Sequence, residues 1–76
     1  MANDRVIETF AKNARETVRV MLTTFQKREL LDIRSCIQGE NELVPTKKGI
    51  TISIDLIPKL KEALEKAEAE IKAARK

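Results

Sequence analysis

Residues 17–37 read TVRVMLTTFQKRELLDIRSCI, and apolar side chains alternate with other residues in two runs of this stretch. The apolar members are Val18, Val20 and Leu22 in the first run and Leu31, Ile33 and Ile37 in the second. A period of two residues is typical of β-strands that bury one face and leave the other in water. The stretch therefore predicts two neighbouring strands.

The connection between these two strands, residues 24–29, contains no Gly, Pro, Asn or Asp. Two-residue hairpin turns favour such residues because their central positions require positive φ. We therefore do not expect a standard two-residue turn here. The sequence instead predicts that the strands continue into a β-ribbon that projects from the sheet, with Lys27 and Arg28 near its tip.

Two fainter patterns flank the central strands. Residues 6–11 and 49–53 each contain a short alternating run, which indicates a strand at each end of the sheet. Asn13 and the segment 38–42 provide the Asn and Gly that chain reversals need. We expect an antiparallel meander of four strands over roughly residues 5–53.

From Asp55 onward the chain consists mostly of Leu, Ala, Glu and Lys, which favour an α-helix over roughly residues 55–75. Ser53 is also a good N-cap residue, but a cap there would place Pro58 inside the helix. We therefore predict that Asp55 caps the regular helix and that any helical turn before it is irregular. The expected fold class is α+β: a four-stranded antiparallel sheet followed by one C-terminal helix, in a single domain of residues 1–76.

The predicted helix carries an apolar stripe at alternating spacings of three and four residues, which is a heptad pattern. Its members are Ile57, Leu60, Leu64, Ala67 and Ile71. A chain of 76 residues has little interior, and domains of this size commonly need disulfides, metal or self-association. Because Cys36 is the only cysteine and His is absent, we predict a homodimer through the helices. The alternative is that the stripe packs on the chain's own sheet.

The composition argues against an enzyme. The chain has 15 Lys and Arg against 12 Asp and Glu, a formal net charge of +3, and its only aromatic residues are two Phe. Without His, most metal sites and most acid–base catalysis near neutral pH are disfavoured. We expect no enzymatic activity, no cofactor and no metal. No apolar stretch reaches the length of a signal peptide or membrane span, so we expect no membrane partner.

Four features follow one another in a recognisable order: Phe25, the D-I-R of residues 32–34, the K-K-G-I of residues 47–50, and the helix. This array resembles the positive cofactor four family of transcriptional coactivators over roughly residues 16–67. The resemblance implies a curved sheet and a protomer that dimerises through its helices and part of its sheets. It also implies binding of single-stranded DNA, largely without regard to sequence.

Carried over by position, the resemblance implies a set of nucleic-acid-binding residues. They are Phe25, Arg28, Arg34, Lys47, Lys48 and the adjoining Gly49. The strand pattern alone adds Arg19 and Lys27, which it places on the wetter face and on the ribbon. Lys and Arg can follow a phosphate backbone, and Phe25 can stack on a base. Cys36 and Ile37 stand where eukaryotic members have aromatic residues, so we expect phosphate contacts to supply the larger part of the affinity.

Two functions follow from these observations. The first is a dimeric single-stranded DNA-binding protein that acts in transcription or in handling melted DNA, with RNA and the transcription machinery as further candidate partners. The alternative is a protein-interaction module of the same fold. For the DNA-binding protein we expect a cytoplasmic, nucleoid-associated location in a bacterium and a nuclear one in a eukaryote.

Overall fold

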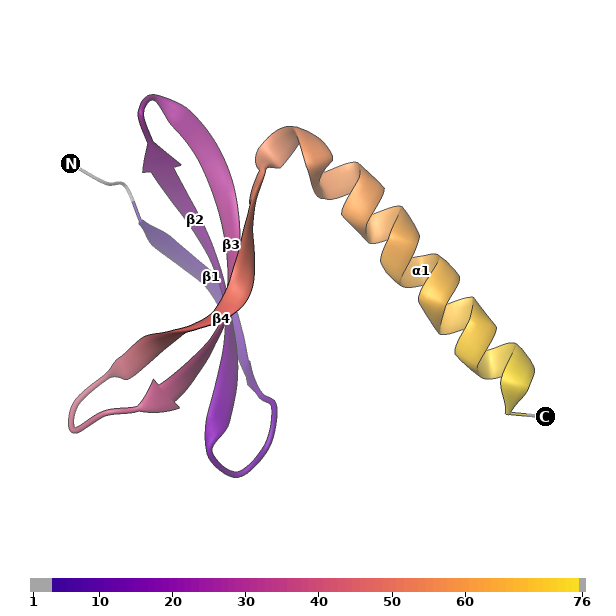
Figure 1. The fold of residues 1–76 in the computed structure, drawn as a ribbon, viewed down its shortest axis with the longest axis horizontal. Helices are drawn as coiled ribbons and strands as arrows, with labels where there is room; N and C mark the ends of the chain where they lie inside the picture. Colours follow the sequence, from indigo (N-terminus) through magenta and orange to yellow (C-terminus); the bar gives the residue numbers. More distant parts are fainter. Residues whose placement is uncertain (1–3, 76) are drawn as a thin grey trace.

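The computed structural model describes residues 4–75, which form a four-stranded sheet, a short 3₁₀ helix and one α-helix (Figure 1). The elements are β1 (Arg5–Ala11), β2 (Glu16–Phe25), β3 (Arg28–Gln38), β4 (Leu43–Ser53), η1 (Ile54–Leu56) and α1 (Ile57–Ala74). Neighbouring strands are antiparallel and keep the order of the chain, so the sheet is a meander. The predicted α+β fold is confirmed. The last strand begins at Leu43 and not at residue 49, while residues 1–3 and 76 of the predicted domain lie outside the described residues.

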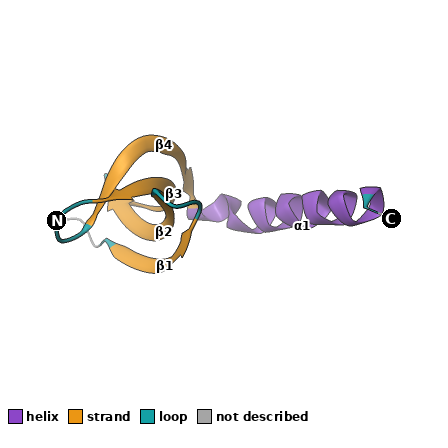
Figure 2. Cartoon of the chain, turned by 90° about the horizontal axis from the view of Figure 1, so that it is seen from below, coloured by secondary structure: helices purple, strands orange, loops and turns teal. Residues whose placement is uncertain are grey.

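The sheet is curved (Figure 2). Its two faces differ in chemistry. On one face, aliphatic side chains lie beside one another across three strands, and we call this the apolar face. Its ladders are Val20, Ile33 and Ile50, and next to them Leu22, Leu31 and Ile52. The polar face carries Arg19, Asp32, Arg34 and Thr51 from the same strands. The alternation of apolar and polar side chains predicted from residues 17–37 is therefore confirmed. The polar face is not left in water as expected, because Asp32 on this face is only 5% exposed.

The connection between β2 and β3 consists of only two residues, Gln26 and Lys27. The prediction that this connection is not a two-residue turn is wrong. Both residues have positive φ, 52° for Gln26 and 66° for Lys27, which is the signature of a type I′ turn. That turn matches the twist of the strands, whose pairing continues up to Phe25 and Arg28, so strand pairing overrides the residues' own preference. Lys27 and Arg28 lie at the tip, as predicted.

The helix begins later than the sequence suggested. Ser53 accepts a hydrogen bond at its Oγ from the Asp55 N–H (3.3 Å) and thereby caps η1. The N-cap of α1 is Leu56, so the prediction that Asp55 caps the regular helix is wrong. The irregular turn before the regular helix is confirmed as η1. Pro58 falls in the first turn of α1, where the amide it lacks has no intrahelical partner to lose.

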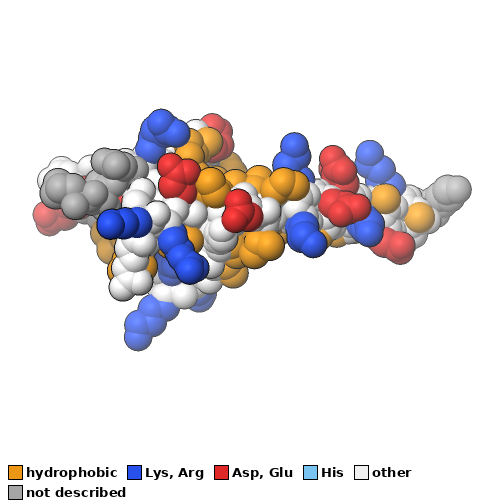
Figure 3. All heavy atoms as spheres, turned by 90° about the horizontal axis from the view of Figure 1, so that it is seen from above, with side chains coloured by type: hydrophobic (Ala, Val, Ile, Leu, Met, Phe, Trp, Pro, Cys, Tyr) orange, Lys and Arg blue, Asp and Glu red, His pale blue; other side chains and the backbone are white. Residues whose placement is uncertain are grey.

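Helix α1 projects away from the sheet (Figures 1 and 3). None of its described residues is buried, and the side chains of Leu64 and Ile71 are 60% and 51% exposed. Among residues 4–75, the buried apolar residues are Leu31 and Cys36 alone. The radius of gyration is 14.6 Å, whereas a compact chain of this length has about 11 Å. The stripe therefore does not pack on the chain's own sheet within the described residues.

Candidate nucleic-acid interface

Asp32 forms the centre of a polar cluster on the polar face of the sheet. Arg34 donates from Nη2 to Oδ1 (2.9 Å) and from Nε to Oδ2 (3.2 Å). Thr51 donates from Oγ1 to Oδ1 (2.8 Å), and Nη2 of Arg19 lies 4.0 Å from Oδ2. One buried carboxylate thus holds two guanidinium groups, and the cluster keeps a net charge of +1.

The charge of Asp32 is maintained by these partners. Burial raises the pKa of the carboxyl, but hydrogen bonds from Arg34 and Thr51 and the charges of Arg34 and Arg19 lower it by more. The pKa of Asp32 is therefore below its ordinary value. The hydrogen bond with Asp32 raises the pKa of Arg34 in turn. Asp32 and Arg34 are therefore both ionised at neutral pH.

Arg34 and Arg19 are largely held by the protein. Nη1 of Arg34 also donates to the carbonyl of Thr46 (2.9 Å), so this side chain links β3 to β4. The side chains of Arg34 and Arg19 are only 22% and 15% exposed. Nε of Arg19 is buried without a hydrogen-bond partner among the described residues. The two arginine side chains therefore contribute positive charge at fixed positions on the polar face.

A bulge in β4 brings two consecutive lysines to the surface. Between the pairs Arg34–Gly49 and Cys36–Pro45, three residues of β4 lie opposite Ser35 alone. The three are Thr46, Lys47 and Lys48. Thr46 closes the bulge, since its Oγ1 donates to the carbonyl of Ser35 (2.7 Å) and accepts from the N–H of Lys48 (3.2 Å). Bulges re-aim side chains, and here Lys47 and Lys48 are both exposed.

Gly49 allows the two strands to approach beside this bulge. A Cβ atom at Gly49 would lie 2.5 Å from the carbonyl oxygen of Ile33 and 2.8 Å from the Cα of Arg34. Both neighbours are backbone atoms, so they cannot rotate away. The structure thus assigns Gly49 a packing role next to Lys47 and Lys48.

The tip of the β2–β3 hairpin forms a second exposed region. Phe25 is 62% exposed, and Lys27 and Arg28 are exposed beside it. Arg28 and Arg34 are six residues apart on β3, which corresponds to about 20 Å along the strand. An aromatic ring with basic neighbours thus lies at one end of the sheet, and the lysine bulge lies toward the other.

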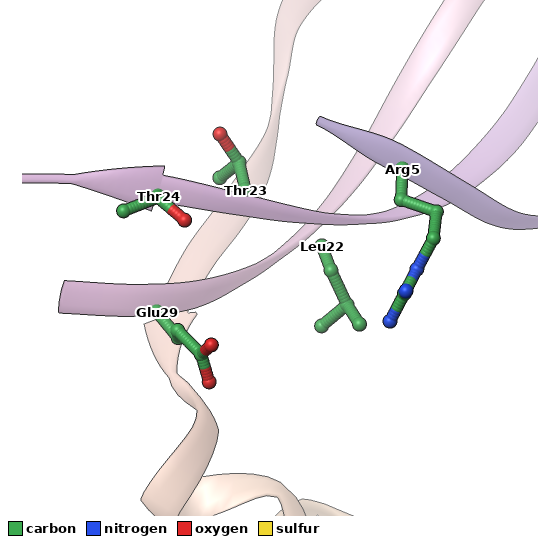
Figure 4. A pocket seen from close by; sticks show the side chains of 5 residues that line it. All are labelled: Arg5, Leu22, Thr23, Thr24 and Glu29. Atoms are coloured by element: carbon green, nitrogen blue, oxygen red, sulfur yellow. The ribbon is translucent and has the colours of Figure 1, made fainter. Parts of the chain in front are cut away.

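A hollow between β1, β2 and β3 has a different chemistry (Figure 4). It has a volume of about 180 Å³ and is lined by Arg5, Leu22, Thr23, Thr24 and Glu29. One basic and one acidic side chain border it, so it has no net charge that would attract phosphate. We therefore do not include it in the interface.

Metal-ligating side chains do not gather in residues 4–75, because no three of the described Cys, Asp and Glu side chains lie close enough to hold an ion. Over the same residues, no helix combines the length and the apolar character that crossing a membrane requires. The surface features that remain as candidate sites are therefore the hairpin tip and the lysine bulge.

Residues 12–63 match the model of the family described as Transcriptional Coactivator p15 (PC4). The match includes the hairpin tip, the Asp32 cluster and the lysine bulge. This chain belongs to the PC4 family. Membership in a family of transcriptional coactivators agrees with the class of function expected from the sequence.

The fold is also similar to that of a PC4 homolog from Burkholderia pseudomallei, solved in two crystal forms. In the tetragonal form the TM-score is 0.78 at 24% identity, covering 87% of this chain and 98% of that chain. In the orthorhombic form the TM-score is 0.79 at 25% identity, covering 84% and 88%. No curated protein matches this chain in sequence.

In this PC4-family chain, the nucleic-acid-binding residues predicted from the sequence fall into two groups. Phe25, Lys27 and Arg28 form the hairpin tip. Arg19, Arg34 and Gly49 are paired in one row across β2, β3 and β4, and Lys47 and Lys48 lie in the adjoining bulge. The predicted dimer residues all lie on α1. Ile57 and Leu60 are half-buried near η1, while Leu64, Ala67 and Ile71 are exposed.

Sequence reasoning missed three charged residues of this PC4-family surface. The contact of Asp32 with Arg34 was not predicted, although the spacing of two residues places both on one strand face. Lys12 and Glu16 form an ion pair of 3.2 Å, and Glu16 also pairs with Lys48 at 3.3 Å. Because the second contact joins positions far apart in the chain, no local pattern could have indicated it.

Proposed function

We propose that this chain forms a homodimer that binds single-stranded DNA, largely without regard to sequence, in transcription or in the handling of melted DNA. The observation that carries the proposal is the hairpin tip, where the exposed ring of Phe25 stands beside Lys27 and Arg28. A solvent-exposed aromatic ring with cationic neighbours suits an unpaired base and its phosphates. Membership in the PC4 family supports the same function.

The lysine bulge provides the second half of the proposed contact. Lys47 and Lys48 are exposed on β4, on the same sheet as the hairpin tip. Lysines that neutralise phosphates release condensed counterions, which gives affinity without base recognition. Stacking on Phe25 requires a base that is not paired within a duplex. The combination therefore favours a single strand over a duplex.

The proposed dimer rests on surface that the chain leaves uncovered. The accessible surface is 6540 Å², whereas a folded monomer of this mass exposes about 4,700 Å². The difference of roughly 1,800 Å² exceeds the ~800 Å² that one partner buries in a standard interface. We assign the contact to the stripe of α1 and to the ladder of Leu22, Leu31 and Ile52 on the apolar face. Lys12 and Lys48 border the neighbouring ladder at Ile33 and Ile50, which stays outside the proposed contact. The dimer would carry twice the net charge of +3, that is +6.

We further propose that the protein has no enzymatic activity of its own and acts through its contacts with DNA and the transcription machinery. In a bacterium it would then be found at the nucleoid, and in a eukaryote in the nucleus. Family membership supports this role.

Fluorescence anisotropy with labelled single-stranded and duplex oligonucleotides over a salt series tests the proposal. We expect tighter binding to the single strand and an affinity that falls steeply with salt. Replacing Lys47 and Lys48 together by Ala should weaken binding and flatten the salt dependence. Replacing Lys59 and Lys61 on α1 removes the same charge outside the proposed contact and serves as the control.

A second function, protein binding by the same fold, is favoured by the ion pair between Asp32 and Arg34, which removes one cation from the free surface. Equal or absent binding of single-stranded and duplex DNA at low salt would support this function and contradict the first. A matched RNA oligonucleotide in the same series shows whether the sugar matters, since stacking and phosphate contacts hardly distinguish the two.

A further inference from the structure

Two lysines flank the carboxylate of Glu16 at the end of the sheet where the β1–β2 turn lies. Nζ of Lys12 lies 3.2 Å from Oε1 of Glu16, and Nζ of Lys48 lies 3.3 Å from Oε2. Lys12 follows β1, Glu16 begins β2, and Lys48 belongs to the bulge of β4. The cluster is therefore created by the fold, which joins the turn to the lysine bulge.

The turn fixes the position of Glu16. Oδ1 of Asn13 accepts hydrogen bonds from the N–H groups of Arg15 (2.9 Å) and Glu16 (2.8 Å). The carbonyl of Glu16 accepts from the N–H groups of Lys12 (2.9 Å) and Asn13 (3.2 Å). Nδ2 of Asn13 also donates to Oε1 of Glu16 (3.4 Å). The hydrogen bonds of the turn thus preorganise the backbone at Glu16.

The carboxylate and the lysines differ in exposure. The Glu16 side chain is 17% exposed, whereas those of Lys12 and Lys48 are 48% and 71% exposed. Hydrogen bonds from Lys12 and Lys48 lower the pKa of Glu16, so it is ionised at neutral pH. A hollow of about 460 Å³ beside the cluster is also bordered by Arg15. Three cations and one anion leave this region with a net charge of +2.

We propose that Lys12 extends the nucleic-acid interface beyond the lysine bulge, and that Glu16 limits its affinity by competing with phosphate for Lys12 and Lys48. The inference rests on the proposed function. Each lysine shares its ammonium donors with the Glu16 carboxylate, and a phosphate that binds both lysines lies close enough to this carboxylate to be repelled by it. Glu16 thus competes with phosphate for the two lysines and lowers the affinity of the protein for a single strand.

The variant Glu16→Gln tests this competition, because it removes the charge and keeps the shape and the acceptor for Asn13. We expect an oligonucleotide Kd that is about three- to tenfold lower than that of the wild type near 0.1 M salt. The slope of log K against log salt should steepen by about 0.7 for each phosphate gained on a single strand. Glu65→Gln, on the exposed face of α1, changes the net charge equally and should leave Kd within twofold, on the order of the charge effect alone.

A double-mutant cycle shows whether Glu16 acts through the lysines. In a background with Lys12 and Lys48 both replaced by Ala, Glu16→Gln should lose most of its effect. Thermal unfolding of each variant verifies that the fold is kept. If wild type binds but Glu16→Gln and Glu65→Gln give the same Kd and salt slope, the competition is refuted and the proposed function stands. If neither the wild type nor Glu16→Gln binds the oligonucleotide, both the competition and the proposed function are refuted.

Discussion

Asp32 and Arg34 lie two residues apart on one face of β3 and meet through two parallel contacts of 2.9 Å and 3.2 Å. Such two-point pairing is the strong form of an arginine–carboxylate interaction. The remaining guanidinium nitrogen binds the carbonyl of Thr46, so the pair also fastens the bulged part of β4. The cation expected to contact DNA is therefore at the same time a structural element of the sheet.

Asp32→Asn should lower the free energy of unfolding by about 1–3 kcal/mol, because it leaves two partly buried guanidinium groups without their counter-charge. Chemical denaturation at fixed protein concentration measures the change. Glu65→Gln, which removes an exposed carboxylate, is the control and should change stability by less than about 0.5 kcal/mol. An Asp32→Asn protein as stable as the control would contradict the structural role of the pair.

The same pair predicts how stability depends on pH. Since the folded-state pKa of Asp32 is lowered, its ionised form contributes stability that is present in full above its ordinary pKa of about 3.9. This contribution is lost as the pH falls through that value toward the folded-state pKa. The stability difference between wild type and Asp32→Asn should therefore shrink below about pH 4. If the stability difference between the two proteins stayed constant down to pH 2, the lowered pKa of Asp32 would be excluded as its cause.

Gly49→Ala should destabilise the protein by about 1–3 kcal/mol, because the added methyl group meets backbone atoms of β3 that can move only with the strand. Thermal unfolding measures this loss. The neighbouring variant Lys47→Ala is exposed and should leave stability unchanged while weakening oligonucleotide binding. If both variants had the same melting temperature, the close approach of β4 to β3 would be disproved.

Gln26→Gly should stabilise the hairpin, since a non-glycine residue in the left-handed region costs about 1 kcal/mol that glycine avoids. For a domain of this size the melting temperature should rise by about 4–8 °C per kcal/mol. The change keeps Lys27 and Arg28, so it separates turn geometry from charge. Gln26→Ala, which leaves the positive φ strained, should give no such rise, and equal effects of the two would count against the turn type.

Leu64→Glu should prevent self-association, because it places a charge in the middle of the apolar stripe of α1. Sedimentation at micromolar concentration should detect monomers, and thermal unfolding of the variant should begin at a lower temperature than that of the wild type. Ala69→Glu, on the opposite side of the same helix, should leave the dimer intact. A Leu64→Glu protein that remains a stable dimer would show that the stripe is not the interface.

Phe25→Ala should weaken binding of a single strand by about 1–3 kcal/mol without changing the salt slope, because it removes stacking and no charge. Phe25→Trp keeps a ring and should preserve or strengthen the affinity. Anisotropy titrations at two salt concentrations distinguish these effects. An unchanged Kd for Phe25→Ala would leave the exposed ring without a role in DNA binding.

The fold was predictable where hydrophobic periodicity was strong. Alternation in residues 17–37 identified the two central strands, and the heptad pattern from Ile57 identified the helix. The turn at Gln26 and Lys27 was not predictable from residue preference, because the twist of the paired strands imposes its geometry. The start of α1 was missed because Ser53 caps a separate 3₁₀ turn and Pro58 fits the first turn of the regular helix.

The candidate site was predictable only in part, because contacts between residues far apart in the chain leave no local sequence pattern. The basic residues could be identified from the order of motifs, but not the carboxylates that hold them. Asp32 shares a strand face with Arg34, so alternation alone could have revealed that contact. Glu16 meets Lys48 only because the folded sheet brings the start of β2 close to the bulge of β4, and no sequence pattern records this contact.

An open sheet leaves one strand at each side with unpaired amide and carbonyl groups, and foreign strands can add there. The bulge in β4 places Pro45, which has no amide hydrogen, and two lysines along one of these edges. On the other edge, the register of β1 shifts between Val6 and Glu8. Both edges are thereby poor templates for a further strand, and such features are the means by which sheets avoid edge-to-edge aggregation.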